Sequence, residues 1–285
     1  MASPNLTLVP PNLREQVLLA LAEDIGSGDR TAALIPEGHL GSATIKARDA
    51  AILCGQPWFE TVFEQLDASV EIQWHALEGA QTAPDALIAS LRGPARALLT
   101  GERTALNFLQ TLSAVATQTH RFSEAVAGCR AQIVDTRKTL PGLRLAEKYA
   151  VRVGGGANHR MGLYDGILIK ENHIAAAGNL SAAIRQALIA APPGVFVQVE
   201  VETLAQLDEA LLAGAPMILL DNMTLAQQYQ AVAVTSGRAV LEVSGGVSLD
   251  TVREIALTGV DRISVGSLTK DIKAVDFSMR FQLDE

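Results

Sequence analysis

The sequence predicts an α/β protein in which an N-terminal α+β unit with an antiparallel sheet precedes a compact or incomplete α/β barrel. In roughly the first hundred residues, short segments alternate between apolar and polar residues, which is typical of half-buried antiparallel strands. From residue 131 onward, fully apolar runs alternate with helical segments, which is typical of a parallel sheet. This second segment spans about 135 residues, well short of the roughly 250 of a complete eightfold barrel. A doubly wound open sheet is the architectural alternative.

The N-terminal unit is predicted to contain two helices and three strands. The helices cover residues 11–24 and 56–66, and the strands cover 42–48, 70–74 and 87–91. The first helix has apolar residues at helical spacing and is followed by two glycines. The strands alternate between apolar and polar side chains, as expected when one face of a sheet is buried.

A long helix is predicted over residues 100–128, with Thr100 as its N-terminal cap. Arg103 then lies in the first turn, where a cation opposes the helix dipole by about 0.3–1 kcal/mol. Spacing alone favours an ordinary surface arginine. The alternative is that Arg103 contacts an anion, including one bound in another subunit.

Six apolar strand candidates come next. They cover residues 131–136, 166–170, 195–201, 216–222, 239–246 and 261–267, and helical segments lie between them. Almost every run ends in polar residues or glycine. Parallel α/β folds place their active sites at the carboxyl ends of the strands. The six endings together therefore predict an active site along this edge.

Composition narrows the class of protein. The chain has 285 residues, is 48% hydrophobic and carries a formal charge of −8. The acidic balance and the low aromatic content, 4%, argue against nucleic acid as the main partner. Cys54 and Cys129 lack metal-type spacing and are predicted to be buried thiols in a reducing compartment. No signal peptide is recognised in residues 1–16, and no apolar run is long enough to span a membrane. We expect a soluble cytoplasmic protein.

Residues 135–173 form a basic segment within this acidic chain. Seven cations against four acids give it a charge of +3: Arg137, Lys138, Arg144, Lys148, Arg152, Arg160 and Lys170 oppose Asp135, Glu147, Asp165 and Glu171. The local excess predicts a pocket for a small polyanion. The three cations at four-residue steps, from Arg144 to Arg152, are predicted to form an exposed helical stripe. The other four follow strands or a glycine run.

Glu200 and Asp221 end successive strands, so their carboxylates are predicted to approach one cavity. Two carboxylate oxygens, with water and substrate phosphates, are a ligand set that Mg²⁺ accepts. The alternative is that the two carboxylates form ion pairs with Lys170 and Lys138.

Glycines mark two further strand endings. Ser244, Gly245 and Gly246 precede a helix, and Gly266 follows the last strand. In barrels, the corresponding loops commonly hold a phosphate on backbone N–H groups, although tight turns use glycine as well. The glycines at 154–156 are predicted to permit close backbone packing before the His159-Arg160 pair.

Three arginines have the chemistry to hold carboxylates in a bidentate manner: Arg103, Arg137 and Arg160. His159 either donates to an anion or packs as a histidine whose hydrogen bonds are satisfied within its loop. The other histidines, His39, His75, His120 and His173, show no ligand or triad spacing.

Several long motifs, in order, resemble the quinolinate phosphoribosyltransferase family, also called nicotinate-nucleotide pyrophosphorylase (carboxylating). They are EDIGSGD (23–29), LTGERTALNFLQ (99–110), DTRKTLPGLR (135–144), KYA (148–150), GGGANHR (154–160), IKENH (169–173), VEVE (199–202), LLDN (219–222), EVSG (242–245) and ISVGSLT (263–269). The resemblance covers nearly the whole chain.

The resemblance implies a fold and a reaction. The fold is an N-terminal α/β sandwich over residues 1–112, joined by the C-terminal segment 267–285, and a seven-stranded incomplete barrel over 113–266. The six strands found by pattern are one fewer. The reaction joins quinolinate and 5-phosphoribosyl 1-diphosphate, with Mg²⁺, to give nicotinate mononucleotide, diphosphate and CO₂ in NAD biosynthesis. The family implies a homodimer, which in some members assembles further.

The resemblance also implies residue roles. Arg137, His159, Arg160 and Lys170 would bind the quinolinate carboxylates, joined by Arg103 from the neighbouring subunit. Lys138, Ser244, Gly245, Gly246 and Gly266 would bind phosphates, and Glu200 and Asp221 would serve the metal-diphosphate and ribose. Lys138, Lys170, Glu200 and Asp221 are assigned to catalysis. Lys270 stands where some relatives carry His, and it is assigned to phosphate.

Three other functions compete with this one. Lys170 at a strand end is also typical of a Schiff-base lyase. A relative with the same fold and a changed substrate is the second alternative. The third is a sugar-phosphate binding protein without catalysis, which would need no paired Glu200 and Asp221.

Overall fold

The computed structural model describes residues 9–284, which fall into two compact units. The first unit combines the chain up to His120 with Leu140–Gly155 and the C-terminal stretch from Thr269. The second unit combines Arg121–Thr139 with Gly156–Leu268. The expectation about a signal peptide concerns residues 1–16, of which 1–8 lie outside the described residues.

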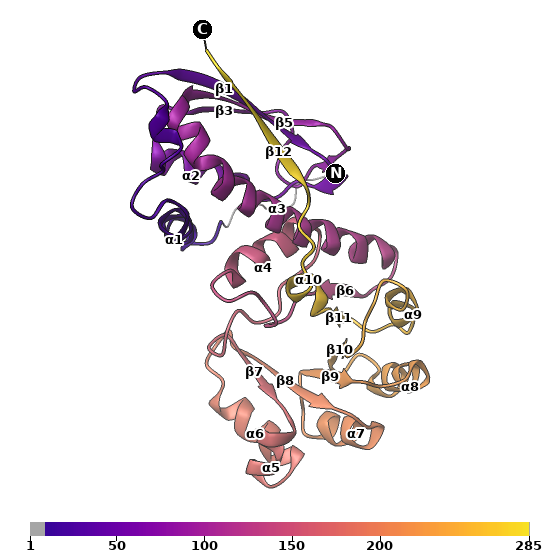
Figure 1. The fold of residues 1–285 in the computed structure, drawn as a ribbon. Coiled ribbons are helices and arrows are strands. Elements are labelled where there is room, and N and C mark those ends of the chain that lie inside the picture. The colour runs from indigo at the N-terminus through magenta and orange to yellow at the C-terminus, as the bar shows by residue number, and fades with distance from the viewer. Residues whose placement is uncertain (1–8, 285) are drawn as a thin grey trace. The chain divides into compact units, whose positions relative to one another are not determined.

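The first unit contains a four-stranded antiparallel sheet with strand order β12-β1-β5-β3 (Figure 1). The strands are β1 (Leu40–Ala47), β3 (Glu71–Trp74), β5 (Leu87–Pro94) and β12 (Phe277–Leu283). Every second residue of β1 is buried from Gly41 to Ala47, so the predicted alternation is confirmed. The C-terminal strand β12 pairs with β1 along its whole length, which the alternation pattern did not predict.

The helices of this unit are α1 (Leu13–Ile25), α2 (Gln56–Leu66), α3 (Ala95–Ala125) and α4 (Arg144–Val153). The short elements are η1 (Ala32–Leu34), β2 (Ala51–Ile52), β4 (Gln81–Thr82) and α10 (Ser267–Lys270). Four large side chains of α2 are buried: Trp58, Phe59, Val62 and Phe63. At roughly 1.5–3 kcal/mol for each large apolar side chain, they form a main part of this core.

Helix α3 begins five residues earlier than predicted, so Thr100 is not its cap. The backbone N–H of Ala95 donates to His39 O at 2.8 Å, and Thr100 Oγ1 donates to Asp29 Oδ2 at 2.9 Å. Residues 95–99 (ARALL) are strong helix formers that extend the helix back to Pro94. Arg103 therefore lies in the third turn, where the dipole argument no longer applies.

Helix α4 is buried on nearly every side, and the prediction of an exposed basic stripe is wrong. Lys148 is only 1% exposed, and Arg144 and Arg152 are half-buried. Spacing at four residues identifies one helix face, but it does not show what covers that face. At the end of this helix, a Cβ on Gly154 would lie 2.3 Å from Ala116 O, so the predicted close packing of this glycine is confirmed.

A half-buried carboxylate, Glu78, holds two helices of the first unit. It accepts hydrogen bonds from the backbone N–H of Gly55 and Gln56, at the start of α2, and from the Tyr149 hydroxyl on α4. These bonds replace the side-chain cap that α2 lacks. Burial raises the pKa of Glu78, although the three hydrogen bonds oppose that shift.

The second unit contains a six-stranded parallel sheet. Its strands are β6 (Gln132–Val134), β7 (Gly166–Ile169), β8 (Phe196–Val201), β9 (Met217–Asp221), β10 (Val240–Ser244) and β11 (Arg262–Ser264). The spatial order is β6-β11-β10-β9-β8-β7. The last strand thus pairs with the first, and the others follow one another without reversal. A sheet that returns to its first strand is a barrel, so the doubly wound alternative is excluded and the predicted incomplete barrel is confirmed.

Helices follow these strands around the outside of the barrel (Figure 1). They are α5 (Glu171–Ala177), α6 (Leu180–Ala190), α7 (Leu204–Leu212), α8 (Leu225–Thr235) and α9 (Val252–Leu257). Side chains of Asn179, Thr203 and Thr224 cap three of them, as the residue types predict. Helix α5 was not predicted. It lies in the segment that the pattern left as a loop.

An isolated bridge lies beside β6. Ala157 forms a parallel bridge with Val134, and its N–H and C=O bond to Ile133 and Asp135. This single bridge is not a strand, so the sheet among residues 9–284 has the six strands that the pattern predicted and not the seven that the resemblance implies.

Two further sequence expectations concern thiols and membranes. Cys54 is fully buried as predicted, but Cys129 is only half-buried, and both thiols are free. Among residues 9–284, no helix combines the length and apolar character that crossing a membrane requires.

Replacing Glu78 by Ala should lower the free energy of unfolding by about 3 kcal/mol, because three hydrogen-bond donors lose their partner. Urea unfolding measures this change, and Glu64→Ala, an exposed position on α2, is the control. The pKa of Glu78 in the folded protein is above its ordinary value of 4.5. The contribution of Glu78 to stability therefore falls as the pH rises from that ordinary value through the pKa of the folded protein. The variant should lose this pH dependence. Equal unfolding midpoints for Glu78→Ala and Glu64→Ala would contradict the assigned role.

Candidate active site

Carboxylates extend from adjacent strands of the second unit on one face of the sheet. Glu200 on β8 pairs with Leu219 on β9, and Asp221 on β9 pairs with Ser244 on β10. Side chains two residues apart on a strand share a face, so Asp221 lies on the face that carries Leu219 and Glu200. The parallel register therefore brings both acids to the carboxyl ends of neighbouring strands.

Lys170, directly after β7, forms an ion pair with Glu200. Its Nζ lies 2.9 Å from Oε2, and the two side chains are 44% and 13% exposed. Asp221 accepts a hydrogen bond from Asn222 Nδ2 at 2.9 Å. The alternative interpretation of Glu200 as a partner of Lys170 therefore describes this structure. A cation bound to Glu200 would compete with Lys170 for the same carboxylate.

The donor set at these strand ends suits a hard cation that keeps much of its water. Among residues 9–284, no group of three or more histidine, cysteine, aspartate or glutamate side chains could hold a metal ion. Two carboxylates, Glu200 and Asp221, are of the ligand type that Mg²⁺ accepts alongside water and phosphate, and a metal ion at this place stays a prediction.

A glycine corner lies at the last strand ends. A Cβ on Gly266 would lie 3.2 Å from Cδ of Lys138 and 3.6 Å from Thr136 Oγ1. Thr136 Oγ1 also accepts from the backbone N–H of Lys138, which holds the start of this loop. The sequence placed Lys138 and Gly266 at separate strand ends, and the pairing of β6 with β11 brings them together. A lysine side chain lying over bare backbone is suited to an anion.

The loop after β10 also depends on glycine. Gly245 has φ +101°, and a Cβ there would lie 2.2 Å from Asn222 Oδ1. Gly246 has φ +60° with open space around its α-carbon. Backbone in this region is rarely adopted by other residues, so this turn next to Asp221 requires both glycines.

The two arginines of the basic segment affect each other electrically. Arg160 Nη1 donates to Gly166 O at 2.9 Å. Burial lowers the pKa of Arg160, and the positive charge of Arg137 lowers it further. Two guanidinium groups close enough to perturb each other favour an anion between or beside them, since an opposite charge relieves the repulsion.

His159 is buried, and both ring nitrogens have partners. Nε2 lies 2.8 Å from Gln198 Oε1, and Nδ1 accepts from the backbone N–H of Arg160 at 2.8 Å. Nε2 therefore carries the proton in the neutral ring. Asp135 accepts from the His159 backbone N–H and from Asn158 Nδ2, which fixes the loop. These contacts match the packed interpretation, and a direct contact between His159 and an anion stays a prediction.

Sequence reasoning assigned no role to a buried polar group beneath His159. Glu242 on β10 has a side chain that is 0% exposed, and Arg262 Nε on β11 lies 3.2 Å from its Oε2. His159 Nε2 lies 3.6 Å from Oε1 of the same carboxylate. The available signal was polar residues in the middle of apolar strands, namely Gln198, Glu242 and Arg262.

Two predicted site residues belong to the first unit. Arg103 is exposed on α3, and Lys270 at the end of α10 forms an ion pair with Asp271, with Nζ 2.7 Å from Oδ2. Because the Arg103 side chain is exposed, it is accessible to a second copy of the chain, as a site shared between subunits requires.

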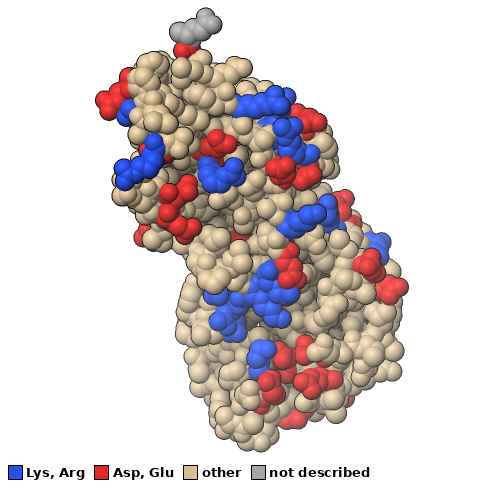
Figure 2. Space-filling model, viewed as in Figure 1, with Lys and Arg blue, Asp and Glu red and all other residues tan. Residues whose placement is uncertain are grey.

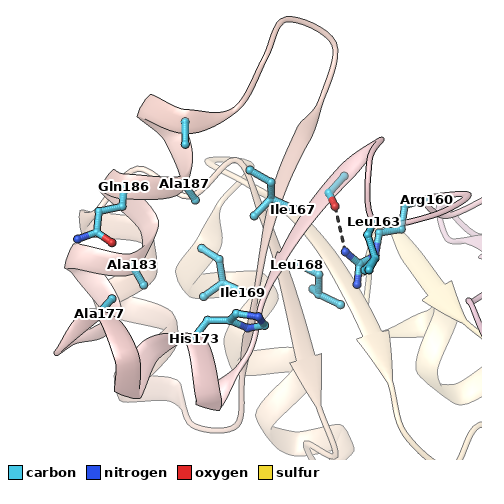
Figure 3. Close-up of a pocket in the computed structure, with 12 residues that line it drawn as sticks. Arg160, Leu163, Ile167, Leu168, Ile169, His173, Ala177, Ala183, Gln186 and Ala187 are labelled. Carbon is cyan, nitrogen blue, oxygen red and sulfur yellow. Dashed lines mark hydrogen bonds between the residues drawn. The ribbon is translucent and has the colours of Figure 1, made fainter.

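A pocket of about 400 Å³ lies between β7 and helices α5 and α6 (Figure 3). Ile167 and Ile169 point toward α6, and Arg160 also lines this pocket. A second pocket of about 400 Å³ lies within the first unit, lined by α1, α3 and residues 141–143. On the face drawn in Figure 2, basic side chains gather over the second unit with acidic ones beside them.

Comparison with protein families gives two matches, in order, along the chain. The model described as quinolinate phosphoribosyl transferase, N-terminal domain, matches residues 29–113, and the corresponding C-terminal domain model matches residues 115–280. A probable nicotinate-nucleotide pyrophosphorylase [carboxylating] of Bacillus subtilis is 44% identical, over 90% of this chain and 89% of that protein. A nicotinate-nucleotide pyrophosphorylase [carboxylating] of Mycobacterium leprae is 40% identical, over 93% and 96%.

Solved structures agree with these sequence matches. The nicotinate-nucleotide pyrophosphorylase of Francisella tularensis has a TM-score of 0.93 and 42% identity, and it covers 99% of this chain and 100% of its own. NadC of Streptococcus pyogenes has a TM-score of 0.94 and 41% identity, with 98% and 99% covered.

Proposed function

We infer, because the chain belongs to the quinolinate phosphoribosyltransferase family, that it is a pentosyltransferase that makes nicotinate mononucleotide in NAD biosynthesis. Its substrates are quinolinate and 5-phosphoribosyl 1-diphosphate, and its other products are diphosphate and CO₂. The observation that carries this conclusion is the pair of family models that match residues 29–113 and 115–280 in order. Relatives with about 40% identity over nearly full length support it.

The chemistry requires placement and charge more than a protein nucleophile. As diphosphate leaves C1 of the ribose, positive charge develops there, and the pyridine nitrogen of quinolinate attacks this carbon. The ring nitrogen becomes positive. The bond between C2 and its carboxylate then breaks, CO₂ departs, and the electron pair left on C2 is stabilised by the adjacent nitrogen before it takes up a proton.

Arg137, Arg160 and Lys170 bind the two quinolinate carboxylates in this proposal, with His159 beside them. The mutual repulsion of Arg137 and Arg160 supports it, because a dianion would relieve it. The ion pair of Lys170 with Glu200 supports an exchange: a quinolinate carboxylate replaces Glu200 as the partner of Lys170. Glu200 is then released for the second substrate.

Lys138, the loop Ser244–Gly246 and Gly266 bind the phosphates of 5-phosphoribosyl 1-diphosphate, and Lys270 adds a cation. The close approach of Lys138 to Gly266 and the strained glycines after β10 support this assignment. Mg²⁺ would be held by Glu200 and Asp221, where it would neutralise charge on the leaving diphosphate. The remaining charge on the leaving group falls to Lys138.

A homodimer with Arg103 supplied by the neighbouring subunit completes the proposed site. Exposure of Arg103 on α3 supports it. A cytoplasmic location is proposed as well, supported by two free thiols that do not form a disulfide.

The purified protein should release labelled CO₂ from ring-carboxyl-labelled quinolinate only when 5-phosphoribosyl 1-diphosphate and Mg²⁺ are both present. Nicotinate mononucleotide should form in equal amount. Nicotinate in place of quinolinate, and a chelator in place of Mg²⁺, should each abolish product. Turnover of a different ring acid would indicate the changed-substrate relative, and an adduct trapped by borohydride would indicate a Schiff base on Lys170.

Arg137→Ala should weaken quinolinate binding by about 100-fold, because a bidentate charged contact is lost. The affinity of Arg137→Lys for quinolinate should lie between those of Arg137→Ala and the wild type, since lysine keeps the charge without the paired donors. Calorimetric titration with quinolinate measures both, and Arg185→Ala, an exposed arginine on α6, should bind as the wild type does. A normal dissociation constant for folded Arg137→Ala would refute the role.

Mixed dimers of Arg103→Ala and Arg160→Ala subunits should regain activity if sites are shared. Each variant alone lacks one residue at every site, whereas a mixed dimer contains one intact site, so random pairing should restore about a quarter of wild-type activity. Co-expression with two affinity tags isolates the mixed dimers. Mixed dimers as inactive as the parent variants would count against a site built from two subunits.

A further inference from the structure

The second unit buries a polar cluster one layer beneath the candidate site. Its members are His159 from the glycine-run loop, Gln198 on β8, Glu242 on β10 and Arg262 on β11. Gln198 and the Glu242 side chain are 0% exposed, and His159 is 8% exposed. The cluster joins one loop to three strands of the barrel.

Burial of the Glu242 carboxylate costs stability, which suggests that this residue has a role other than stabilising the fold. Removing a carboxylate from water costs several kcal/mol even when a cation is near, and apolar residues would fill the same space without that cost. Neither oxygen of Glu242 has a hydrogen bond of good geometry within residues 9–284, and the Nε of Arg262 is equally without one. The ion pair between them, at 3.2 Å, is therefore poorly optimised for stability alone.

The cluster fixes the orientation of one imidazole ring. Nε2 of His159 faces Gln198 Oε1 at 2.8 Å and Glu242 Oε1 at 3.6 Å, and both oxygens favour a proton on this nitrogen. Phe196 packs against the ring edge to face, with centroids 5.4 Å apart. With Nε2 protonated, Nδ1 is left as the acceptor.

That acceptor holds the backbone of Arg160. The N–H of Arg160 donates to Nδ1 at 2.8 Å, and the Arg160 guanidinium donates to Gly166 O at 2.9 Å. The position of the guanidinium thus depends on the ring of His159. The other tautomer, with the proton on Nδ1, would present N–H to N–H at this point and would push the Arg160 backbone away.

We propose that Glu242 and Gln198 are positioning residues for quinolinate binding, acting through the His159 ring on Arg160. The proposal rests on the function proposed above, because it assigns Arg160 to a quinolinate carboxylate. Glu242 and Gln198 contact neither substrate. They set the tautomer and angle of a ring whose other nitrogen holds the main chain of a binding residue. Arg262 supplies the charge that keeps Glu242 in place.

Gln198→Met and Glu242→Gln test this role in the full-length protein. Each should raise KM for quinolinate by about tenfold, since small displacements of a positioned group cost this much or more. KM for 5-phosphoribosyl 1-diphosphate should stay within about twofold, because the proposed effect runs through His159 to Arg160 and not through the residues assigned to phosphate. Folding is checked by circular dichroism and thermal melting.

Gln228→Met is the matched control. Gln228 is a glutamine of the same unit that is 3% exposed and donates to Met223 O, so its loss should destabilise the barrel without changing KM for quinolinate. If the role of Gln198 were purely structural, Gln198→Met and Gln228→Met would have the same kinetics. That result, or equal changes in KM for both substrates, would overturn the proposal.

A second measurement is independent of turnover. The ¹⁵N shifts of the His159 imidazole should report a proton on Nε2 in the wild type, and this preference should be lost in Gln198→Met. An unchanged tautomer in folded Gln198→Met would overturn the proposal. Wild-type protein that shows the tautomer but no turnover would instead refute the proposed function, so the two failures are distinguishable.

Discussion

The pairing of β6 with β11 is the constraint on which the second unit depends, because it joins the first strand of the parallel sheet to the last. Without it, Lys138 and Gly266 would stand at opposite edges of an open sheet, and the glycine corner over which the lysine lies would not exist. Right-handed connections of one sense then keep the helices outside and every carboxyl end on the same rim. The barrel is left incomplete between the Ala157 bridge and β7, which is where Arg160 reaches across to Gly166 O.

Charge on this rim is arranged in depth. In the proposed function, Arg137, Arg160 and Lys170 receive the substrate anions, and Glu200 forms an ion pair with Lys170 in the structure. One layer below, Glu242 is fully buried against Arg262. An anion-binding site of this kind can therefore be assembled before its substrate is present.

Many of the strands were predictable, because the periodicity of apolar residues along a strand can be recognised from the local sequence alone. The six parallel strands and the antiparallel β1, β3 and β5 were found from apolar runs and alternation. The start of α3 was misplaced because Thr100 is a good cap by type but donates to Asp29 instead. Strand β12 and the burial of Lys148 could not be found from the pattern, since each depends on segments far away in sequence, although the resemblance implied that residues 267–285 join the first unit. The single bridge at Ala157 is too short to leave a pattern.

The site shows the same division between local and distant information. Polar residues at strand ends identified Lys170, Glu200 and Asp221, because the carboxyl edge of a parallel sheet is a local property of each strand. Glu242 was counted only as part of a polar strand ending and Gln198 was passed over, because a polar residue within an apolar run has no partner visible in the sequence. Yet a charged residue inside a buried strand is costly wherever it occurs. Such a residue therefore predicts a partner across the barrel, and here that partner is the histidine on which the backbone of Arg160 rests.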